Sequence, residues 1–227
     1  MAEKQSTTVD RWLQRETPRI RKALESASRY FDANDHLTVN TLEAVYGREN
    51  SFGILLGKRG STDAAGHFQF KPETARRYGL NVSKQNDQRF DIDRASSAAA
   101  RYLKDLNTWF GKRTTLSKGL HTLPVKSISE RKKFVLGAFN AGEGRIAKAQ
   151  RLAEKAGKNP QLWSDIAKYL PKETQQYVET VPRYEAEFAL KSPANKNVKR
   201  KGVRKGKYRC TVGHWRTIDD RPVFICA

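Results

Sequence analysis

The chain has 227 residues, of which 37% are hydrophobic and 30% are charged, and its formal net charge is +20. This length suffices to bury a full core in one domain, with or without an appendage, and no stretch approaches the ~18 apolar residues of a membrane span. The positive charge favours polyanionic partners, a class that includes nucleic acid, anionic membrane surfaces and anionic cell wall, without choosing among them.

Apolar residues recur at helical spacing through most of the chain, which predicts a series of helices. We expect them at residues 9–13, 20–31, 40–49, 72–79, 92–110, 127–140, 143–156, 160–170 and 172–190. Pro182 should kink or split the last of these. Gly111 stands where a C-terminal glycine cap belongs, and Ser127 with Glu130 fits a capping box. Residues 53–66, 81–90 and 112–126 are expected to be loops.

The helix expected from Asn40 carries a carboxylate in an unusual place. Asn40 and Glu43 have the spacing of a capping box at its start. An apolar stripe follows, and Glu49 takes the next position after its members Leu42, Val45 and Tyr46. Burial raises the pKa of a carboxyl group, which lets it donate a proton at neutral pH. The alternative is a frayed helix end that leaves Glu49 in solvent.

Four short motifs follow one another along the chain. They are Glu49-Asn50-Ser51-Phe52, Gly66-His67-Phe68-Gln69, Ala138-Phe139-Asn140-Ala141-Gly142, and Glu173-Thr174 with Tyr177-Val178. Their order resembles the soluble lytic transglycosylase domain, a family related to goose-type lysozyme. That family has Glu-Ser-x-Phe, Gly-Leu-Met-Gln, Ala-Tyr-Asn-Ala-Gly and Glu-Thr-x-x-Tyr-Val. The resemblance covers roughly residues 35–190 and implies a mainly α, lysozyme-like domain.

The resemblance implies a peptidoglycan lytic transglycosylase with Glu49 as its single essential acid. In the family this residue protonates the oxygen of the β-1,4 bond between N-acetylmuramic acid and N-acetylglucosamine. It then takes a proton from the muramic acid's own 6-hydroxyl, which gives a 1,6-anhydro end without consuming water. One group that serves first as acid and then as base needs a pKa near the working pH.

The resemblance also assigns substrate-binding positions. Phe139 replaces the family's usual Tyr, so a hydroxyl near the sugar is expected to be lost, and Tyr177 matches the late Tyr that faces the catalytic Glu. Plainer interpretations are a loop amide that braces its own backbone for Gln69 and core packing for Tyr177. His67 is expected at the groove edge or surface. The assigned positions are Ser51, Phe68, Gln69, Phe139, Asn140 and Tyr177.

Asp63 is a possible second acid. It is the acid closest to the Gln69 motif, where the family pattern has Gly or another small residue, and some hydrolysing relatives hold a water with an acid in this region. An exposed loop aspartate is the plainer interpretation. A goose-type lysozyme that hydrolyses the same bond is therefore an alternative, and a non-catalytic module that binds an anionic surface or nucleic acid is a second one.

The composition changes after residue 190. Residues 191–209 contain nine Lys or Arg and no acid, and residues 210–227 carry no net charge, so the remaining +11 belongs to residues 1–190. Residues 208–227 have a β pattern around a turn at 219–222, which predicts a hairpin. A Cys210–Cys226 bridge could stabilise so small a hairpin by roughly 3 kcal/mol; two buried free thiols are the alternative.

These features predict three parts and a set of partners. Residues 1–34 should form helices that pack on the body at 35–190, and residues 191–227 a basic linker with a small β segment. Peptidoglycan strands are the expected partner, and the basic tail should meet an anionic wall or membrane surface. No metal, cofactor or specific nucleic acid is expected, because no motif for them is present. We expect a monomer that is periplasmic or extracellular. Since residues 1–30 lack a signal peptide's apolar core, export would use a removed leader, a dedicated secretion route or phage lysis.

Overall fold

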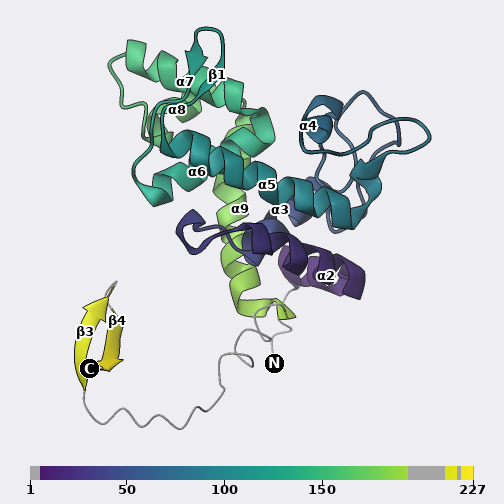
Figure 1. The fold of residues 1–227 in the computed structure, drawn as a ribbon, viewed down its shortest axis with the longest axis horizontal. Coiled ribbons are helices and arrows are strands. Elements are labelled where there is room, and N and C mark those ends of the chain that lie inside the picture. The colour runs from purple at the N-terminus through teal and green to yellow at the C-terminus, as the bar shows by residue number, and fades with distance from the viewer. Residues whose placement is uncertain (1–5, 194–212, 219–220, 227) are drawn as a thin grey trace. The chain divides into compact units, whose positions relative to one another are not determined.

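α-Helices dominate the computed structural model, which describes residues 6–193 together with 213–218 and 221–226 (Figure 1). The chain divides into two units, Met1–Asn195 and Lys196–Ala227. The helices of the first unit are α1 (Thr8–Arg15), α2 (Pro18–Ala27), α3 (Val39–Asn50), α4 (Pro72–Arg77), α5 (Ile92–Gly111), α6 (Ile128–Ala141), α7 (Glu143–Lys155), α8 (Trp163–Ile166) and α9 (Lys172–Lys191). The prediction of a mainly α domain is confirmed.

Short elements join these helices. Single 3₁₀ turns lie at η1 (Ser28–Tyr30), η2 (Ala33–Asp35), η3 (Gln88–Phe90) and η4 (Ala167–Tyr169). Strands β1 (Thr115–Ser117) and β2 (Leu120–His121) pair antiparallel in the segment expected to be a loop. The sequence did not predict them because strands of three and two residues are too short to show an alternation of apolar and polar residues. Among the described residues, none of the helices has the length and apolar character needed to cross a membrane.

The start of α3 corrects one prediction. The capping box joins Thr38 and Thr41, whose hydroxyls accept each other's backbone N–H groups, so the helix begins at Val39. Asn40 and Glu43 lie inside the helix, where the Asn40 amide donates to Glu43 Oε2 at 2.9 Å. Their spacing suits a capping box and also one helical turn, and the Thr pair just before them supplies the cap.

Three other helix ends differ from expectation. Only half of the Ser127 box forms, because the Glu130 carboxylate binds Lys133 and the Trp163 N–H instead. Gly111 is the last helical residue of α5 and not a left-handed cap. Residues 160–170 form α8 and η4, and α8 begins at Trp163 rather than at residue 160. Pro182 lies inside α9 and does not split it.

The core joins α3 to α9 and α5 to α2 and α6. Trp12 of α1 lies flat against α3 because Gly47 has no side chain there; a Cβ on Gly47 would come within 2.4 Å of the indole ring. The same indole stacks with Phe52 and Phe188 at centroid distances of 6.1 and 6.2 Å. The N-terminal helix therefore holds the end of α3 against the end of α9.

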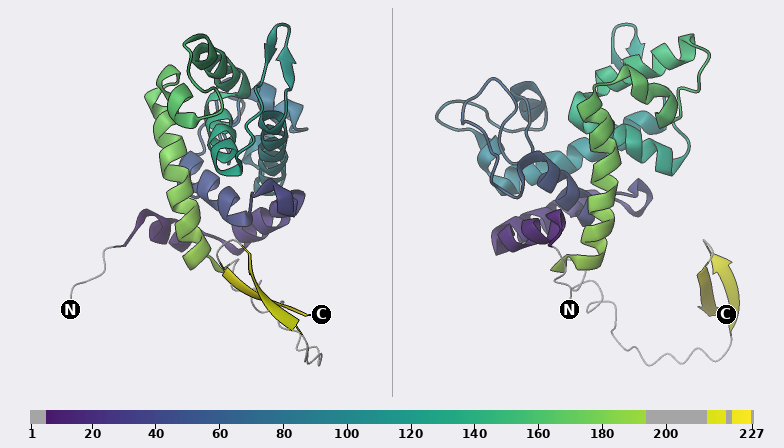
Figure 2. Two further views of the ribbon diagram at one scale, coloured as in Figure 1. Left: turned by 90° about the vertical axis from the view of Figure 1, so that its left-hand side faces the viewer. Right: turned by 180° about the vertical axis from the view of Figure 1, so that it is seen from behind.

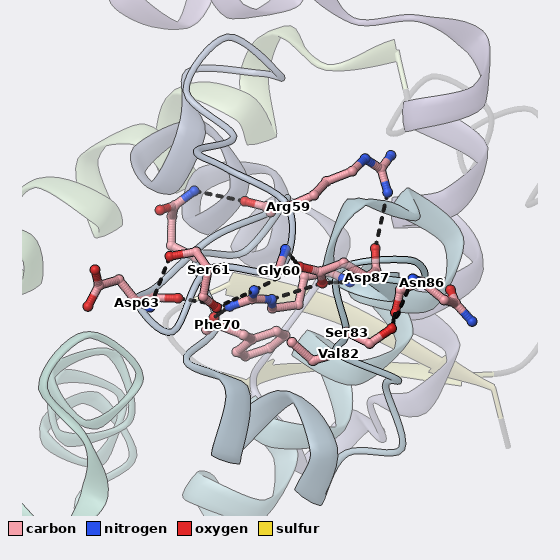
Figure 3. A network of polar contacts seen from close by, with 12 residues as sticks. Arg59, Gly60, Ser61, Asp63, Phe70, Val82, Ser83, Asn86 and Asp87 are labelled. Carbon is pink, nitrogen blue, oxygen red and sulfur yellow. Dashed lines mark hydrogen bonds and ion pairs between the residues drawn. The ribbon is translucent and has the colours of Figure 1, made fainter.

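Residues 51–90 form a lobe with little regular structure, organised by the buried guanidinium of Arg89. Its partners Ser61, Asp63, Phe70 and Asp87 are labelled in Figure 3. Both Asp87 carboxylate oxygens pair with Arg89, at 3.0 and 2.8 Å. The remaining guanidinium protons go to three backbone carbonyls, those of Ser61, Asp63 and Phe70, at 2.8, 2.8 and 3.0 Å. All five donors are thus used, and this Arg89 network fixes three separate stretches of the lobe.

Figure 1 and the reverse view in Figure 2 place this lobe at one end of α5 and the group of α6, α7, α8 and β1 towards its other end. The second unit, described by itself, is an antiparallel pair of β3 (Gly213–Ile218) and β4 (Arg221–Cys226), with Trp215 opposite Phe224. The predicted hairpin is confirmed in its backbone pairing. Cys210 lies outside the described residues, and only the backbone of Cys226 is described, so the bridge stays a prediction.

Candidate active site

Two cavities meet at Glu49. The first cavity, about 350 Å³, extends past Phe68, Phe139 and Arg145. The second cavity, about 290 Å³, extends past Arg48, Glu173 and Tyr177. Four residues line both: Glu49, Ala64, Gln69 and Asn140. The walls thus come from the end of α3, the 51–90 lobe, the α6–α7 corner and the start of α9.

Glu49 is the penultimate residue of α3, directly after the stripe that the sequence predicted to be buried. Leu42, Val45 and Tyr46 are fully buried, and Glu49 itself is partly buried where the stripe reaches the cavities. Burial raises the pKa of its carboxyl from 4.5 to about 7, against the effects of Tyr177 and Arg48, which lower it. The frayed-end interpretation is wrong, because α3 continues to Asn50.

Asn50 fixes the end of α3 to the motif that follows it. Its side chain is buried; it accepts the Gly53 N–H at 2.5 Å and donates to the backbone carbonyl of His67. Ser51 then ends the helix in the left-handed conformation, φ 55°, and its carbonyl accepts from Arg15 at 3.2 Å. Ser51 lines neither cavity. Ser51, which matches the family motif, therefore ends α3 and is not part of the wall of either cavity.

Gln69 combines the two interpretations that the sequence left open. Its Nε2 donates to the carbonyls of Leu55 and Gly66, both at 2.9 Å, so the amide braces the lobe. It also lines both cavities. Among the described residues no group donates to its Oε1, which leaves an acceptor for a ligand.

Tyr177 of α9 lies on the other side of Glu49. Its hydroxyl is buried and meets no partner in standard hydrogen-bond geometry within the described part of the chain. Burial and the nearby Glu49 carboxylate raise the pKa of Tyr177 well above 10.0, so the hydroxyl keeps its proton. The Arg48 guanidinium lies 5.7 Å from the centre of the Tyr177 ring. The residue packs in the core and also faces the candidate acid.

The α6–α7 corner supplies an amide and an aromatic wall. Thr174 donates its hydroxyl to Asn140 Oδ1 at 2.8 Å, which orients the amide and leaves its N–H groups for another acceptor. Phe139, 9% exposed, packs between Phe70 and Tyr102 at 5.9 and 5.4 Å between centroids. Phe68, also in the wall of the first cavity, is 1% exposed.

Asp63 does not join this group. The residue is exposed and lines neither cavity. The Arg89 network holds it by its backbone carbonyl, and its carboxylate points away from the network in Figure 3. Because the main chain is anchored inward, the side chain turns out of the lobe.

Several lining residues were missed from the sequence. Arg48 and Glu173 flank Glu49, and Lys71 and Arg145 line the first cavity. Arg48 directly precedes Glu49, and Glu173 belongs to the last of the four motifs. Their closeness to these motifs along the chain was the one signal in the sequence that could have identified them. His67 differs from its predicted edge position: it is partly buried, its Nδ1 lies 3.0 Å from the Tyr46 hydroxyl, and burial lowers its pKa to about 4.

Comparison with known proteins gives a match over more than half of the chain. Residues 36–162 match the family described as the transglycosylase SLT domain. Membrane-bound lytic murein transglycosylase D of Escherichia coli K12 is 34% identical over 142 residues, which are 63% of this chain and 25% of that protein. Membrane-bound lytic murein transglycosylase F of Shewanella loihica is 30% identical over 115 residues, 50% of this chain and 20% of that protein. The chain thus spans about a quarter of these relatives or less.

Proposed function

Because this chain belongs to the transglycosylase SLT domain family, we propose that it is a peptidoglycan lytic transglycosylase. It cleaves the β-1,4 bond between N-acetylmuramic acid and N-acetylglucosamine and leaves a 1,6-anhydro-muramic acid end. The observation that carries this proposal is the position of Glu49, whose partly buried carboxyl stands where two cavities meet and has a pKa of about 7.

Glu49 supplies both proton transfers. In its protonated form it donates to the glycosidic oxygen as the bond from that oxygen to C1 of muramic acid breaks. The carboxylate that remains accepts the proton of the 6-hydroxyl as O6 bonds to C1, so one bond forms for each bond broken. A pKa of about 7 keeps both forms accessible near neutral pH.

The neighbouring residues support these steps. Tyr177 lowers the pKa of Glu49 and so stabilises the carboxylate that forms after the first transfer. Asn140, held by Thr174, offers an amide donor, and Gln69 offers a carbonyl acceptor to the polar groups of the sugars. Phe68 and Phe139 give the first cavity an apolar wall, as sugar-ring faces require. Ser51 supports the site by ending α3.

A hydrolytic lysozyme on the same scaffold is the second candidate. Hydrolysis needs a carboxylate that can hold a water, and Glu173 lines the second cavity together with Glu49. If Glu173 serves this purpose, the products carry reducing ends and Glu173→Gln suppresses them. In the transglycosylase assignment, Glu173→Gln changes the rate but not the kind of end.

Mass spectrometry of the muropeptides released from purified sacculi separates these assignments. Anhydro ends support the transglycosylase, and reducing ends support the lysozyme. Absence of any release from sacculi and from soluble glycan strands contradicts both and favours a binding module.

The remaining parts receive roles that agree with this function. Residues 1–34 pack on the catalytic domain at 35–190. Residues 191–227 bring it to an anionic wall or membrane surface through the nine basic residues of 191–209, a stretch that contains no acid. The enzyme works on peptidoglycan as a monomer in the periplasm or outside the cell. A Cys210–Cys226 bridge in that oxidising setting would hold the β3–β4 pair together.

A further inference from the structure

The first cavity contains two cations without a carboxylate partner. Lys71 and Arg145 line it, and neither forms an ion pair within the described residues. Glu143, the acid nearest to Arg145 along the chain, is already engaged. Its Oε1 accepts from Arg77 and its Oε2 from the Tyr102 hydroxyl, each at 2.7 Å. The positive charge at this end of the cavity is therefore left for a ligand.

The second cavity differs in charge. There the cation Arg48 has the Glu173 carboxylate in the same lining and the Tyr177 ring beneath it at 5.7 Å. In the first cavity Glu49 is the one carboxyl among the lining residues. Its raised pKa leaves it about half protonated near neutral pH. The two sides of Glu49 thus present unequal charge, with the excess of cations on the side of Lys71 and Arg145.

The negative charge of the substrate is also confined to one part of it. The glycan backbone consists of neutral amides and hydroxyls, and the lactyl group of muramic acid is uncharged when a peptide stem is attached to it. The free carboxylates of an intact strand therefore belong to its stems. A guanidinium can bind such a carboxylate with two parallel hydrogen bonds, and an ammonium binds it as a point charge.

We propose that Lys71 and Arg145 bind the stem carboxylates and make the enzyme select strands with acidic stems over strands with uncharged stems. This inference rests on the proposed function and adds the part of the substrate that the first cavity recognises. The two residues act on specificity: they contact the stem and leave the proton transfers to Glu49.

The test compares two soluble substrates of equal glycan length. One is a peptide-bearing strand with free stem carboxylates, and the other is the same strand after its carboxylates have been converted to amides. The quantity measured is the ratio of kcat/KM for the acidic strand to kcat/KM for the amidated strand. We expect a ratio of about ten for the unmodified enzyme, falling towards one in Lys71→Gln/Arg145→Gln, with the change mainly in KM.

A matched control removes the same charge elsewhere. Lys148→Gln/Lys158→Gln also removes two exposed cations that form no ion pair in the described residues, and neither lines the cavity. This variant should keep the ratio of the unmodified enzyme. A ratio that falls equally in both double variants, or that stays unchanged in Lys71→Gln/Arg145→Gln, overturns the inference. Failure of the unmodified enzyme to cleave either strand instead overturns the proposed function. A melting curve for each variant shows that it is folded.

Discussion

Tyr177 and Glu49 line the same cavity, although 128 positions separate them in the chain. Each changes the acidity of the other: Tyr177 lowers the pKa of Glu49, and the Glu49 charge raises that of Tyr177. Burial is the larger effect on both. A residue of α9 thus adjusts the acidity of a carboxyl group on α3, against the larger effect of burial.

Glu49→Gln should abolish wall cleavage while the protein stays folded. Gln has nearly the same shape but cannot deliver or accept the proton, and general acid–base catalysis contributes roughly 10²–10⁴-fold. Turbidity clearance of sacculi measures the loss. Glu154→Gln, which makes the same change at an exposed position of α7, is the control. Clearance by Glu49→Gln at the rate of the unmodified enzyme would refute the assignment.

Tyr177→Phe should shift the pH dependence of cleavage. The first step needs protonated Glu49, so the rate should fall as pH rises through about 7. The Tyr177 hydroxyl lowers that pKa; its removal should raise it and move the alkaline limb of the profile to higher pH. The measurement is kcat/KM for a soluble strand between pH 5 and 9. If the alkaline limb of the profile stays at the same pH, Tyr177 has only a packing role in the core.

Glu43→Gln should alter stability only at higher pH. Glu43 is 1% exposed, and burial raises its pKa from 4.5 to about 7, although Ser192 and Asn40 hydrogen-bond to it. The folded protein then holds a proton that the unfolded chain releases. Stability from this group is complete below about pH 4.5 and is lost as pH rises through 7, by about 3 kcal/mol for this shift.

The variant removes that proton linkage because Gln stays neutral. Glu43→Gln should therefore unfold at higher denaturant concentration than the unmodified protein at pH 8, with the difference vanishing near pH 4.5. The Ser192 hydroxyl can accept as well as donate, so the amide retains a partner. Equal denaturation midpoints for the variant and the unmodified protein at pH 8 would mean that ionised Glu43 does not destabilise the folded protein.

Arg89→Lys should destabilise the lobe that carries Gln69. An ammonium keeps the charge but has three donors in place of five, so it cannot hold both Asp87 oxygens and the carbonyls of the Arg89 network. Disruption of a buried ion pair costs about 3 kcal/mol or more, which corresponds to a lowering of Tm by roughly 10 °C for a chain of this size. Arg94→Lys, at an exposed position, should leave Tm unchanged. Equal Tm values in the two variants would contradict this role.

Removal of residues 194–227 should weaken binding to sacculi and spare turnover of a short soluble strand. The cut must follow Pro193, because Lys191 pairs with Asp10 at 2.8 Å and the Ser192 hydroxyl bonds to Glu43. The loss of binding should be largest at low salt, since the Debye length is only ~8 Å at physiological ionic strength. A cooperatively melting truncated protein that no longer turns over the short strand would place the tail in the active site.

The long helices and the candidate acid could be predicted because both have a periodic signal. The Leu42, Val45 and Tyr46 stripe identified the buried face, and Glu49 followed as its next member. The Arg89 network could not be predicted, since three of its acceptors are backbone carbonyls that any residue provides. The cap at Thr38 was missed because Asn40 and Glu43 have the same spacing. The two roles of Gln69 likewise depend on contacts with Leu55 that sequence spacing does not specify.

The packing of α3 against α9 has a consequence for synthesis on the ribosome. Glu49 leaves the ribosome early, but Tyr177 and the rest of α9 follow more than a hundred residues later. Before α9 docks, the second cavity lacks the wall that Glu173 and Tyr177 provide. The Glu49 carboxyl should then be more exposed to water, with a pKa closer to the ordinary value of a glutamate. A nascent or prematurely terminated chain would therefore carry Glu49 in a mostly ionised form. Under the proposed function, a chain that lacks α9 should not cleave the wall.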